Sequence, residues 1–493
     1  MKRRTLLRSL GLGLSAGMVV PSLLSSCVKD DPGPEVPFDG TVAIIGAGVA
    51  GMFAADILRA KGINVFILEA GKQIGGRIRS LRNQTDFQDL YGQDTPMEFG
   101  SDFPIELGAE VFYGSDSIWG KAVQNNNLPT LEISSVGVDR YIMENVVKNA
   151  ADWGSDADFT SVQNFVNNLP NYSGGAQSIQ QAAGVSARAQ ALLNAEAANF
   201  YGSNSDKIGV KLLSDDLHRR THDGKIIALK ANPMQDFFLS RFSQIGSLVQ
   251  LEKAVTSINY SGDVIKIKDK SGNEYQANKV IVTVPLSILK TGGISFSPGL
   301  PNEKISALQK FGMDPSFRMI IDFKKNFWGE DAGYIWGGAV APQYLNTGVG
   351  RSELYRTLSF TMNGSSAASL SAMSRDQQIS AVLAELDSVY AGLATKYVRK
   401  TIIKDANGND LEGPIIAAIK DWTKEEYIKG GYSYPLISTS ATDRENLSKP
   451  IKDKIFFAGE ATDSNGDAGT INGALASAER VTREVIDSIV QVS

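Results

Sequence analysis

The sequence predicts an α/β fold in which a parallel, Rossmann-like sheet is assembled from separated segments of the chain. The apolar run Thr41–Ile45 contains β-branched residues, which is typical of a buried parallel strand. A stretch of helix formers from Ala50 to Lys61 follows, and Gly62 is placed to end that helix before a second apolar run, Asn64–Leu68. Strand, helix and strand in this order indicate a βαβ unit.

Glycines connect the first strand to the helix with the spacing G-x-G-x-x-G. Gly46 permits a tight turn, Gly48 removes a side chain that would keep a pyrophosphate from the helix N-terminus, and Gly51 lets the helix lie close on the strand. Glu69 ends the second strand, where a βαβ unit places a carboxylate against ribose hydroxyls. The glycine spacing alone would fit an ordinary turn, but strand, helix, second strand and acid together predict dinucleotide binding.

The first residues of the chain have the pattern of an export signal. Paired arginines in Met1–Arg8 precede a mildly apolar stretch, 9–24, that is too short and too rich in glycine and serine for a membrane span. Leu24-Ser25-Ser26-Cys27 resembles a lipobox, in which the cysteine becomes the acylated first residue of the mature protein. We therefore expect residues 1–27 to be a twin-arginine and lipoprotein signal and 28–39 a linker. The protein is then a periplasmic or cell-surface lipoprotein, unless Cys27 is an incidental residue of a cleaved signal.

Composition describes a large globular protein and excludes several functions. The chain has 493 residues, of which 42% are hydrophobic, and a formal net charge of -5. No basic cluster stands out beyond the signal, so we expect no nucleic-acid partner. A single cysteine permits no intrachain disulfide and no thiolate metal cluster. The two histidines, His218 and His222, have charged and glycine neighbours that indicate an exposed loop, so we also expect no metal site.

A second glycine element, Gly75-Gly76-Arg77, follows Glu69 and Ala70. Its glycines allow close backbone approach, and its arginine offers a forked cation to a phosphate. The pattern E-A-x-x-x-x-G-G-R resembles the flavin-containing amine oxidases, a family that includes monoamine, polyamine and L-amino acid oxidases and the lysine-specific histone demethylase. The resemblance implies that the dinucleotide is FAD. The alternative is a glycine loop followed by a surface arginine.

The resemblance recurs at further places across the chain that follows the signal. Ile105–Glu110 is similar to an E-L-G-A segment that passes close to the flavin ring. Ala254–Ile258 is similar to the strand whose valine backbone meets the adenine, and we expect Met234–Glu252 to be an amphipathic helix leading to it. Lys279–Lys290 is similar to a V-I-V-T-V-P-L strand, which we expect to be the core of the sheet.

The C-terminal signature is an apolar strand ending in Gly459-Glu460 and a small-residue helix, Asn472–Val485. An acid at the carboxyl end of a strand lies where open α/β sheets bind ligands, and helix N-terminal amides there can hold the flavin's pyrimidine carbonyl. A bare strand, turn and helix is the alternative. The cofactor-binding residues expected from these patterns are Gly46, Gly48, Ala50, Gly51, Glu69, Ala70, Gly75, Gly76, Arg77, Leu107, Gly108, Ala109, Val255, Gly459, Glu460, Thr470 and Ile471.

The cofactor segments alternate with two insertions of different composition. We expect an FAD-binding domain from 40–112, 234–291 and 430–493, and an interleaved α+β substrate domain from 113–233 and 292–429. Three separated segments then assemble one sheet, and the active site lies at the seam between the domains.

The segment Gly430–Pro435, preceded by Trp422, is similar to a family stretch that lies beside the flavin. The resemblance makes Tyr432 one wall of an aromatic cage, whose face favours an amine. Thr470 corresponds to the facing wall and is not aromatic, so the cage is half built. A turn tyrosine packed on the core is the alternative interpretation of Tyr432.

Two further residues are candidates for the chemistry. Many family members hold a lysine against flavin N5, and counting back from Phe327-Trp328 places Arg318 at that position. Arginine keeps its proton, so we expect a slow oxidase or a dehydrogenase with another acceptor. The alternatives are that the count is off by a residue or two, or that Arg318 is a strand surface residue. Glu110 stands at a family position that can reach substrate, where a carboxylate attracts the second nitrogen of a diamine or polyamine or makes a structural hydrogen bond.

The sequence therefore predicts an FAD-dependent oxidoreductase that oxidises an amine to an imine, with O2 or another acceptor reoxidising the flavin. The expected catalytic residues are Arg318, Tyr432, Glu110 and Thr470. Some members of the family that the chain resembles attach the flavin through a cysteine, and no cysteine lies near Tyr432 here, so the resemblance implies noncovalent FAD. Two alternatives stay open: a carotenoid or porphyrinogen-type desaturase or oxidase, and a flavin-binding surface lipoprotein without amine oxidase activity.

Overall fold

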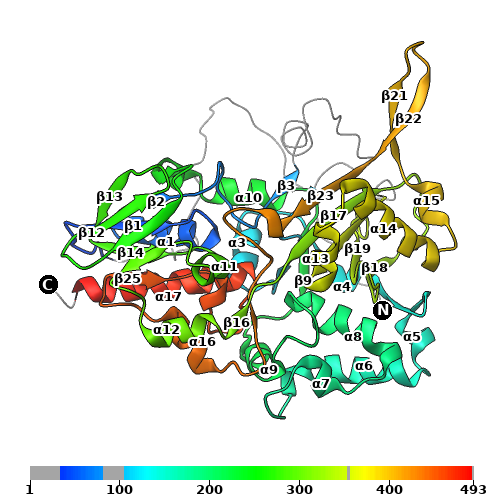
Figure 1. The fold of residues 1–493 in the computed structure, drawn as a ribbon, viewed down its shortest axis with the longest axis horizontal. Coiled ribbons are helices and arrows are strands. Elements are labelled where there is room, and N and C mark those ends of the chain that lie inside the picture. The colour runs from blue at the N-terminus through cyan, green and yellow to red at the C-terminus, as the bar shows by residue number, and fades with distance from the viewer. Residues whose placement is uncertain (1–33, 82–104, 352–355, 491–493) are drawn as a thin grey trace, which may run out of the picture.

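The computed structural model describes residues 34–81, 105–351 and 356–490 (Figure 1). The predicted signal at residues 1–27, including Cys27, and the first part of the linker lie outside the described residues. The described chain confirms the predicted α/β class, with a parallel Rossmann-like sheet in one domain and a mixed sheet in the other. None of the helices in the described ranges is long and apolar enough to cross a bilayer.

The parallel sheet has five strands in the order β10-β2-β1-β14-β25, and all four neighbouring pairs are parallel. Its central strand β1 and its neighbour β14 are almost fully buried, which explains their continuous apolar sequences. The strands are β1 Thr41–Ile45, β2 Asn64–Leu68, β10 Val249–Gln250, β14 Lys279–Val282 and β25 Ile455–Phe457. Three distant parts of the chain thus bring the carboxyl ends of their strands to one edge.

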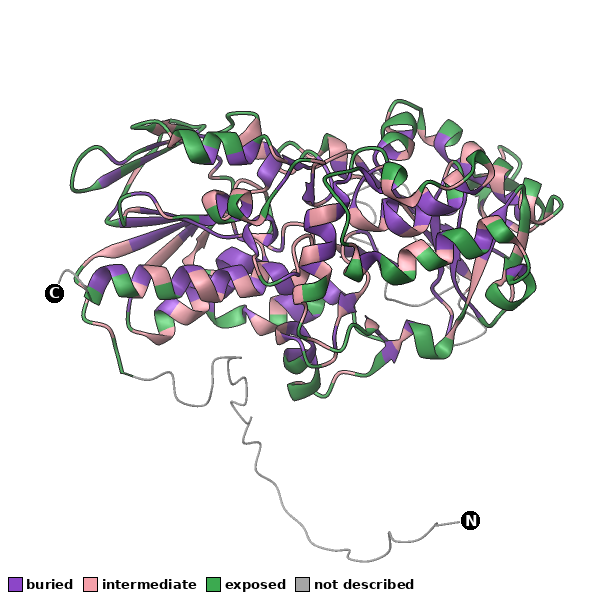
Figure 2. Ribbon diagram, turned by 90° about the horizontal axis from the view of Figure 1, so that it is seen from below, coloured by how far each residue is buried: buried purple, intermediate pink, exposed green. Residues whose placement is uncertain are grey.

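Two helices cover one face of the parallel sheet and a second, four-stranded sheet covers the other (Figure 1). The buried residues of the C-terminal helix pack on the sheet, while the rest of the helix is mostly intermediate in burial (Figure 2). Each buried Val, Leu, Ile or Phe on these faces contributes about 1.5–3 kcal/mol. The helices are α1 Val49–Ala60 and α17 Ile471–Val490, and the four strands are β11 Val255–Asn259, β12 Ile265–Asp269, β13 Glu274–Ala277 and β15 Ser295–Ser297.

The second domain is built on a seven-stranded sheet in the order β23-β17-β20-β19-β18-β7-β8, which is antiparallel except between β18 and β7. One face packs on helices α6 and α8 and the other on α13 and α14. The bounds are β7 Val138–Met143, β8 Val146–Asn149, α6 Ala157–Asn168, α8 Gln190–Ala197, β17 Ser316–Asp322, β18 Ala332–Trp336, β19 Gln343–Asn346, β20 Thr357–Asn363, α13 Ser365–Ser371, α14 Arg375–Val389 and β23 Ala417–Asp421.

Smaller elements connect the two domains or extend from them. Hairpin β21–β22 projects from the second domain (Figure 1). The bounds of these smaller elements are β4 Ile105–Glu106, β5 Phe112–Tyr113, α9 Val210–Arg219, β9 Ile226–Leu229, α10 Met234–Arg241, β16 Phe311–Gly312, β21 Lys400–Lys404, β22 Asp410–Ile415, β24 Tyr434–Pro435 and α16 Ala441–Ser448.

One predicted element is wrong in its extent. The expected helix Met234–Glu252 ends at Arg241, and a 3₁₀ turn over Ser243–Leu248 leads into β10. Strand β10 pairs with β2 and becomes the edge of the parallel sheet. The apolar spacing of the segment fits a helix, but pairing with the open edge of β2 satisfies the backbone of β10 instead.

Candidate functional site

A cavity of about 1320 Å³ lies where the carboxyl ends of the parallel strands meet the seven-stranded sheet. It is larger than the roughly 300–1,000 Å³ of most ligand pockets. All of the predicted cofactor-binding residues line it except Gly51, which lies behind the glycine turn. The predicted catalytic residues Arg318, Tyr432, Glu110 and Thr470 line it as well. The cavity therefore brings together residues from both domains.

The glycine turn after β1 is held by close backbone packing. Gly46 has φ +112°, which a residue with a side chain rarely adopts, and the Thr283 hydroxyl donates to the Ile45 and Gly46 carbonyls at 2.9 and 3.1 Å. A Cβ on Gly51 would lie 2.0 Å from the Gly46 carbonyl oxygen. Gly51 is thus required because α1 begins directly against the turn.

Two glycines of the cradle face open space. A Cβ on Gly48 would meet no heavy atom within 4 Å, and one on Gly76 would meet only the Gly48 Cα, at 3.6 Å. The first amides of α1 have no intrahelical acceptor, and the helix dipole places partial positive charge there. The space between Gly48 and Gly76 therefore suits an anionic group such as a diphosphate.

Glu69 ties this cradle to the second strand. Its Oε2 accepts from the Ala47 amide at 2.6 Å, and its Oε1 accepts from the Gly71 amide at 2.7 Å. An ionised carboxylate has about four acceptor positions, so two remain for ribose hydroxyls. Val255 lines the same cavity from the start of β11.

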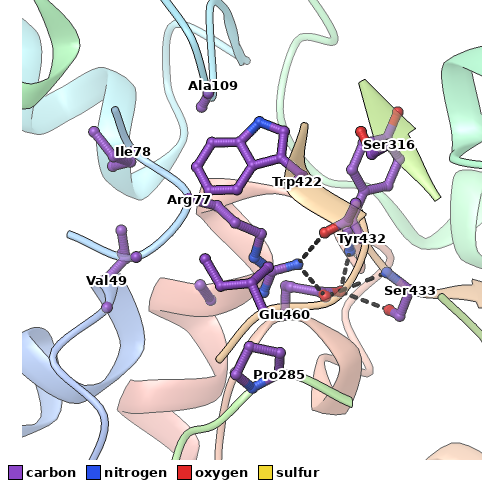
Figure 3. Close-up of a pocket in the computed structure, with 18 of the residues that line it drawn as sticks. Val49, Arg77, Ile78, Ala109, Pro285, Ser316, Trp422, Tyr432, Ser433 and Glu460 are labelled. Carbon is purple, nitrogen blue, oxygen red and sulfur yellow. Dashed lines mark hydrogen bonds and ion pairs between the residues drawn. The ribbon is translucent and has the colours of Figure 1, made fainter. Parts of the chain in front are cut away.

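Arg77 and Glu460 form a clasp below the ring of Trp422 (Figure 3). Arg77 Nη1 donates to Glu460 Oε1 and to the Gly431 carbonyl, both at 2.8 Å. Glu460 also accepts from the amide and hydroxyl of Ser433 and, at 3.0 Å, from the amide of Gly469. The sequence analysis predicted that Arg77 contacts a phosphate, whereas in the structure it forms an ion pair with Glu460.

The charge state of Glu460 follows from this clasp. Burial alone would raise the pKa of its carboxyl, but Arg77 and the hydrogen bonds from Ser433 hold the pKa below its usual range. The ionised carboxylate then joins the glycine loop, the segment before β24 and the start of α17. Its role as a direct cofactor ligand stays a prediction.

The segment Leu107–Ala109 runs along the Arg77 loop and is fixed from two sides. The Gly108 amide donates to the Arg79 carbonyl at 3.0 Å, and a Cβ on Gly108 would lie 2.0 Å from the Arg77 carbonyl oxygen. Trp422 Nε1 donates to the Leu107 carbonyl at 2.9 Å. The segment is therefore positioned by both domains.

Arg318 and Glu110, which the sequence treated separately, contact each other. Arg318 Nη2 donates to Glu110 Oε2, and Nη1 donates to the Thr361 hydroxyl. Its Nε donates to the Glu106 carbonyl at 3.3 Å. The Arg318 and Glu110 side chains are only 9% and 12% exposed. Arg318 is therefore a buried, paired cation and not a strand surface residue.

Tyr432 lies at the edge of an aromatic cluster. Its hydroxyl donates to the Phe200 carbonyl at 2.8 Å and accepts from Asn363 Nδ2 at 3.2 Å, and burial raises its pKa. Phe200 makes edge-to-face contacts with Tyr113 and Tyr201. The cavity-lining residues that the sequence analysis missed include Tyr113, Phe200, Tyr201, Tyr334, Gln343 and Thr361. Nothing in their local sequence distinguishes them from core residues.

Thr470 begins α17. Its hydroxyl donates to the Asp467 carbonyl at 2.6 Å and accepts from the Gly473 amide at 3.1 Å. Such a hydroxyl satisfies a helix amide that has no intrahelical acceptor. Thr470 thus sets the position of the α17 N-terminus at the cavity, next to Ile471.

The exposed-loop prediction is wrong in one respect for each histidine, because His218 lies in helix α9 and the side chain of His222, although in a loop, is buried. His218 is exposed at the end of α9, but the His222 side chain is 4% exposed and its Nε2 lies 2.9 Å from Asp467 Oδ1. The Gly224 amide donates to His222 Nδ1 at 3.0 Å, so Nε2 carries the proton. Gly114 lies against this ring, since a Cβ added to it would lie 2.6 Å from His222 Cγ. Within the described ranges, no group of three or more His, Cys, Asp or Glu side chains is arranged to hold a metal ion.

A Rossmann-like sheet, a glycine cradle and an adjoining cavity shared by two domains define a dinucleotide-dependent oxidoreductase. The family model described as flavin containing amine oxidoreductase matches residues 213–486, and that of an NAD(P)-binding Rossmann-like domain matches residues 44–122. The first match covers more than half of the chain. The protein belongs to the flavin-containing amine oxidoreductase family.

The curated relatives include lysine-specific histone demethylase 1 homolog 3 of Arabidopsis thaliana and homolog 2 of Oryza sativa subsp. japonica. They are 25% and 24% identical over 521 and 484 residues. These alignments cover 92% and 94% of this chain but only 30% and 59% of the relatives. The chain therefore spans less than two thirds of the length of either relative.

Solved structures of amine oxidases share the fold. Cyclohexylamine oxidase from Brevibacterium oxydans IH-35A has a TM-score of 0.71 and 18% identity over 92% of this chain and 100% of its own. Wild-type putrescine oxidase bound to putrescine has a TM-score of 0.71 and 17% identity over 91% and 99%. At this identity the likeness concerns the fold alone.

Membership of the family implies FAD as the cofactor, and the described residues fit it. The open space at Gly48 and Gly76 accepts a diphosphate, and Glu69 has acceptor positions left for a ribose. The cavity continues from this cradle to the clasp of Arg77 and Glu460 and the aromatic cluster, so a single ligand can extend along it.

Proposed function

We propose that the protein oxidises an amine to an imine, using noncovalently bound FAD. The observation that carries the proposal is one cavity that runs from the glycine cradle of a flavin amine oxidoreductase fold to a cluster of tyrosines. When bound, FAD supplies the two-electron oxidation of the carbon that bears the nitrogen, and O2 or another acceptor takes the electrons afterwards. Water then hydrolyses the imine.

The residues of the chain hold and orient the reactants. The α1 N-terminus, Gly48 and Gly76 hold the diphosphate, and Glu69 holds a ribose. The N-terminus of α17, which also lines the cavity, would favour negative charge on the bound cofactor. The ring of Tyr432 offers its electron-rich face to the amine.

Noncovalent attachment is supported by the cysteine count. The only cysteine, Cys27, precedes both domains, so neither domain offers a thiol for a thioether to the flavin. Acid precipitation of the purified protein is expected to release the yellow colour into the supernatant. Colour that stays in the pellet contradicts this part of the proposal.

The test of the reaction is anaerobic mixing of the FAD-loaded protein with mono-, di- and polyamines. Bleaching of the visible flavin band with formation of the aldehyde supports amine oxidation. A protein that binds FAD but is bleached by no amine refutes it and favours a desaturase or a non-catalytic flavoprotein.

The electron acceptor is a separate part of the proposal. Arg318 stands where many family members have a lysine, and it is held by Glu110 and Thr361. A guanidinium in this pair does not give up its proton, so we propose a dehydrogenase or a slow oxidase. Reoxidation of the reduced protein by an electron-accepting dye much faster than by O2 is the expected result, and equal rates contradict it.

We also propose that the chain is exported as a lipoprotein, on the basis of the paired arginines and the lipobox ending at Cys27. Cys27→Ser is expected to move the protein from the membrane fraction to the soluble fraction after export. A wild-type protein found only in the soluble fraction contradicts the lipid anchor.

A further inference from the structure

The substrate end of the cavity is built on one row of the seven-stranded sheet. Strand pairing places Arg318 directly opposite Lys420 on β23 and Thr361 on β20, and Thr361 directly opposite Gln343 on β19. Directly opposed residues point to the same face of a sheet, and these four side chains line the cavity. Tyr334 on β18 lines it from the same face.

The charges in this row are already paired. Glu110 enters from the Leu107–Ala109 segment of the other domain, and Arg318 donates to it. Thr361 and the Glu106 carbonyl accept from the other two nitrogens of the guanidinium, so the guanidinium is fixed on three sides. Lys420 next to it pairs with Glu425. The carboxylate of Glu110 therefore already has the positive charge of Arg318 beside it, and it has no net charge left to offer a ligand.

The other groups around this end are neutral or paired. Burial raises the pKa of Tyr113, Tyr334 and Tyr432, so their hydroxyls stay protonated at physiological pH. Arg220, which lies over the Tyr113 ring, pairs with Asp467 at 3.3 Å. The charged side chains Arg318, Lys420 and Arg220 at this end thus each have an opposite charge beside them: Glu110, Glu425 and Asp467.

We propose that the Arg318–Glu110 pair makes this site select amines whose body is uncharged, aliphatic or aromatic, over diamines of the same length. The proposal rests on the proposed amine oxidation and names its substrate class. A second ammonium brought to this end loses its hydration and finds no free carboxylate, while Arg318 repels it. An alkyl or aryl group instead packs on Phe200, Tyr201 and Tyr334.

Three probes of similar length and different far ends test the proposal: hexylamine, cadaverine and ε-aminocaproate. The FAD-loaded wild type is expected to be reduced by hexylamine with a kcat/KM at least about tenfold above that for cadaverine, as one charge contact of moderate strength requires. The melting temperature of the apoprotein with each probe, and of the FAD-loaded protein first reduced with dithionite, gives a binding readout that needs no turnover. A wild type that prefers cadaverine in both readouts overturns the proposal.

Charge variants give opposite expected changes. Arg318→Met leaves Glu110 unpaired and is expected to raise the cadaverine to hexylamine ratio by about tenfold or more. Glu110→Gln leaves Arg318 unpaired and is expected to raise the ratio of ε-aminocaproate to hexylamine in the same way. The double variant R318M/E110Q is neutral and returns the preference to hexylamine. Unchanged ratios in both single variants overturn the proposal.

Controls separate this outcome from misfolding and from failure of the proposed function. Arg140→Met breaks an ion pair to Asp331 at the surface and is expected to leave all ratios unchanged. If the single variants do not fold, the proposal is judged from the kcat/KM ratios of the wild type and of the double variant for the three probes. If no probe bleaches the flavin, amine oxidation fails, and the ranking of melting temperatures still tests the pair.

Discussion

Gly48→Ala tests directly whether the glycine cradle holds the cofactor. Gly48 precedes α1 with φ −77° and ψ −177°, an extended conformation that alanine adopts without strain. Its Cβ would meet no protein atom within 4 Å. The apoprotein should therefore change in stability by less than about 0.5 kcal/mol. The methyl group enters the space assigned to the diphosphate, and overpacking costs about 1–3 kcal/mol.

This energy converts to an FAD dissociation constant about 5 to 150-fold higher than that of the wild type. Fluorescence titration of the apoprotein with FAD measures the constant, and urea denaturation of the apoprotein measures its stability. Gly51→Ala is the matched control, because its Cβ would lie 2.0 Å from the Gly46 carbonyl oxygen. It is expected to destabilise the apoprotein by about 1–3 kcal/mol or more.

Two results would refute this reasoning. If Gly48→Ala binds FAD as tightly as the wild type does, the space between Gly48 and Gly76 is not the diphosphate site. If Gly48→Ala destabilises the apoprotein as much as Gly51→Ala does, the glycine is required by the fold and not by the ligand.

Three further predictions concern charge and the aromatic wall. Glu460→Gln is expected to cost about 2 kcal/mol near pH 7, less than a fully buried pair because Arg77 is 29% exposed. The folded pKa of Glu460 is depressed, so its contribution is present above the unfolded pKa of about 4.3 and is lost as the pH falls through the folded pKa. Urea midpoints of the wild type and variant should therefore converge in acid, and parallel curves contradict the clasp. Burial lowers the pKa of Lys304 to about 7 in the folded protein. Between about pH 7 and 10 the unfolded chain therefore binds more protons, so the stability of the wild type should rise with pH over this range. Lys304→Met should abolish that rise. Tyr432→Phe keeps the ring and should have a kcat/KM within about threefold of the wild-type value. Tyr432→Ala removes the ring and should lower kcat/KM by about 2 to 30-fold. An equal loss of kcat/KM in the two variants would contradict the orienting role of the ring.

The fold and the cofactor cradle were predictable because their signals are local. The β-branched run of β1, the turn at Gly46 and the carboxylate of Glu69 lie within one βαβ unit, where strand, turn and helix chemistry decide the structure. The helix predicted from Met234 extended too far, because the open edge of β2 is a tertiary feature that captures β10.

The ion pairs that join distant segments at the cavity were not predictable in the same way. Arg77 and Glu460 are 383 positions apart, and Arg318 and Glu110 are 208 positions apart. Arg318 looked like a changed lysine position and Glu110 like a free carboxylate, because a single sequence contains no signal that they meet. Only the packing of β17 against the Leu107–Ala109 segment brings them together and neutralises both.

The most direct test of amine oxidation is a single anaerobic turnover with hexylamine, following the flavin spectrum and the aldehyde formed after hydrolysis. The account predicts complete bleaching of the visible flavin band, with one equivalent of hexanal per flavin. Retention of the oxidised spectrum with every amine tested, in protein that holds a full complement of FAD, would contradict it.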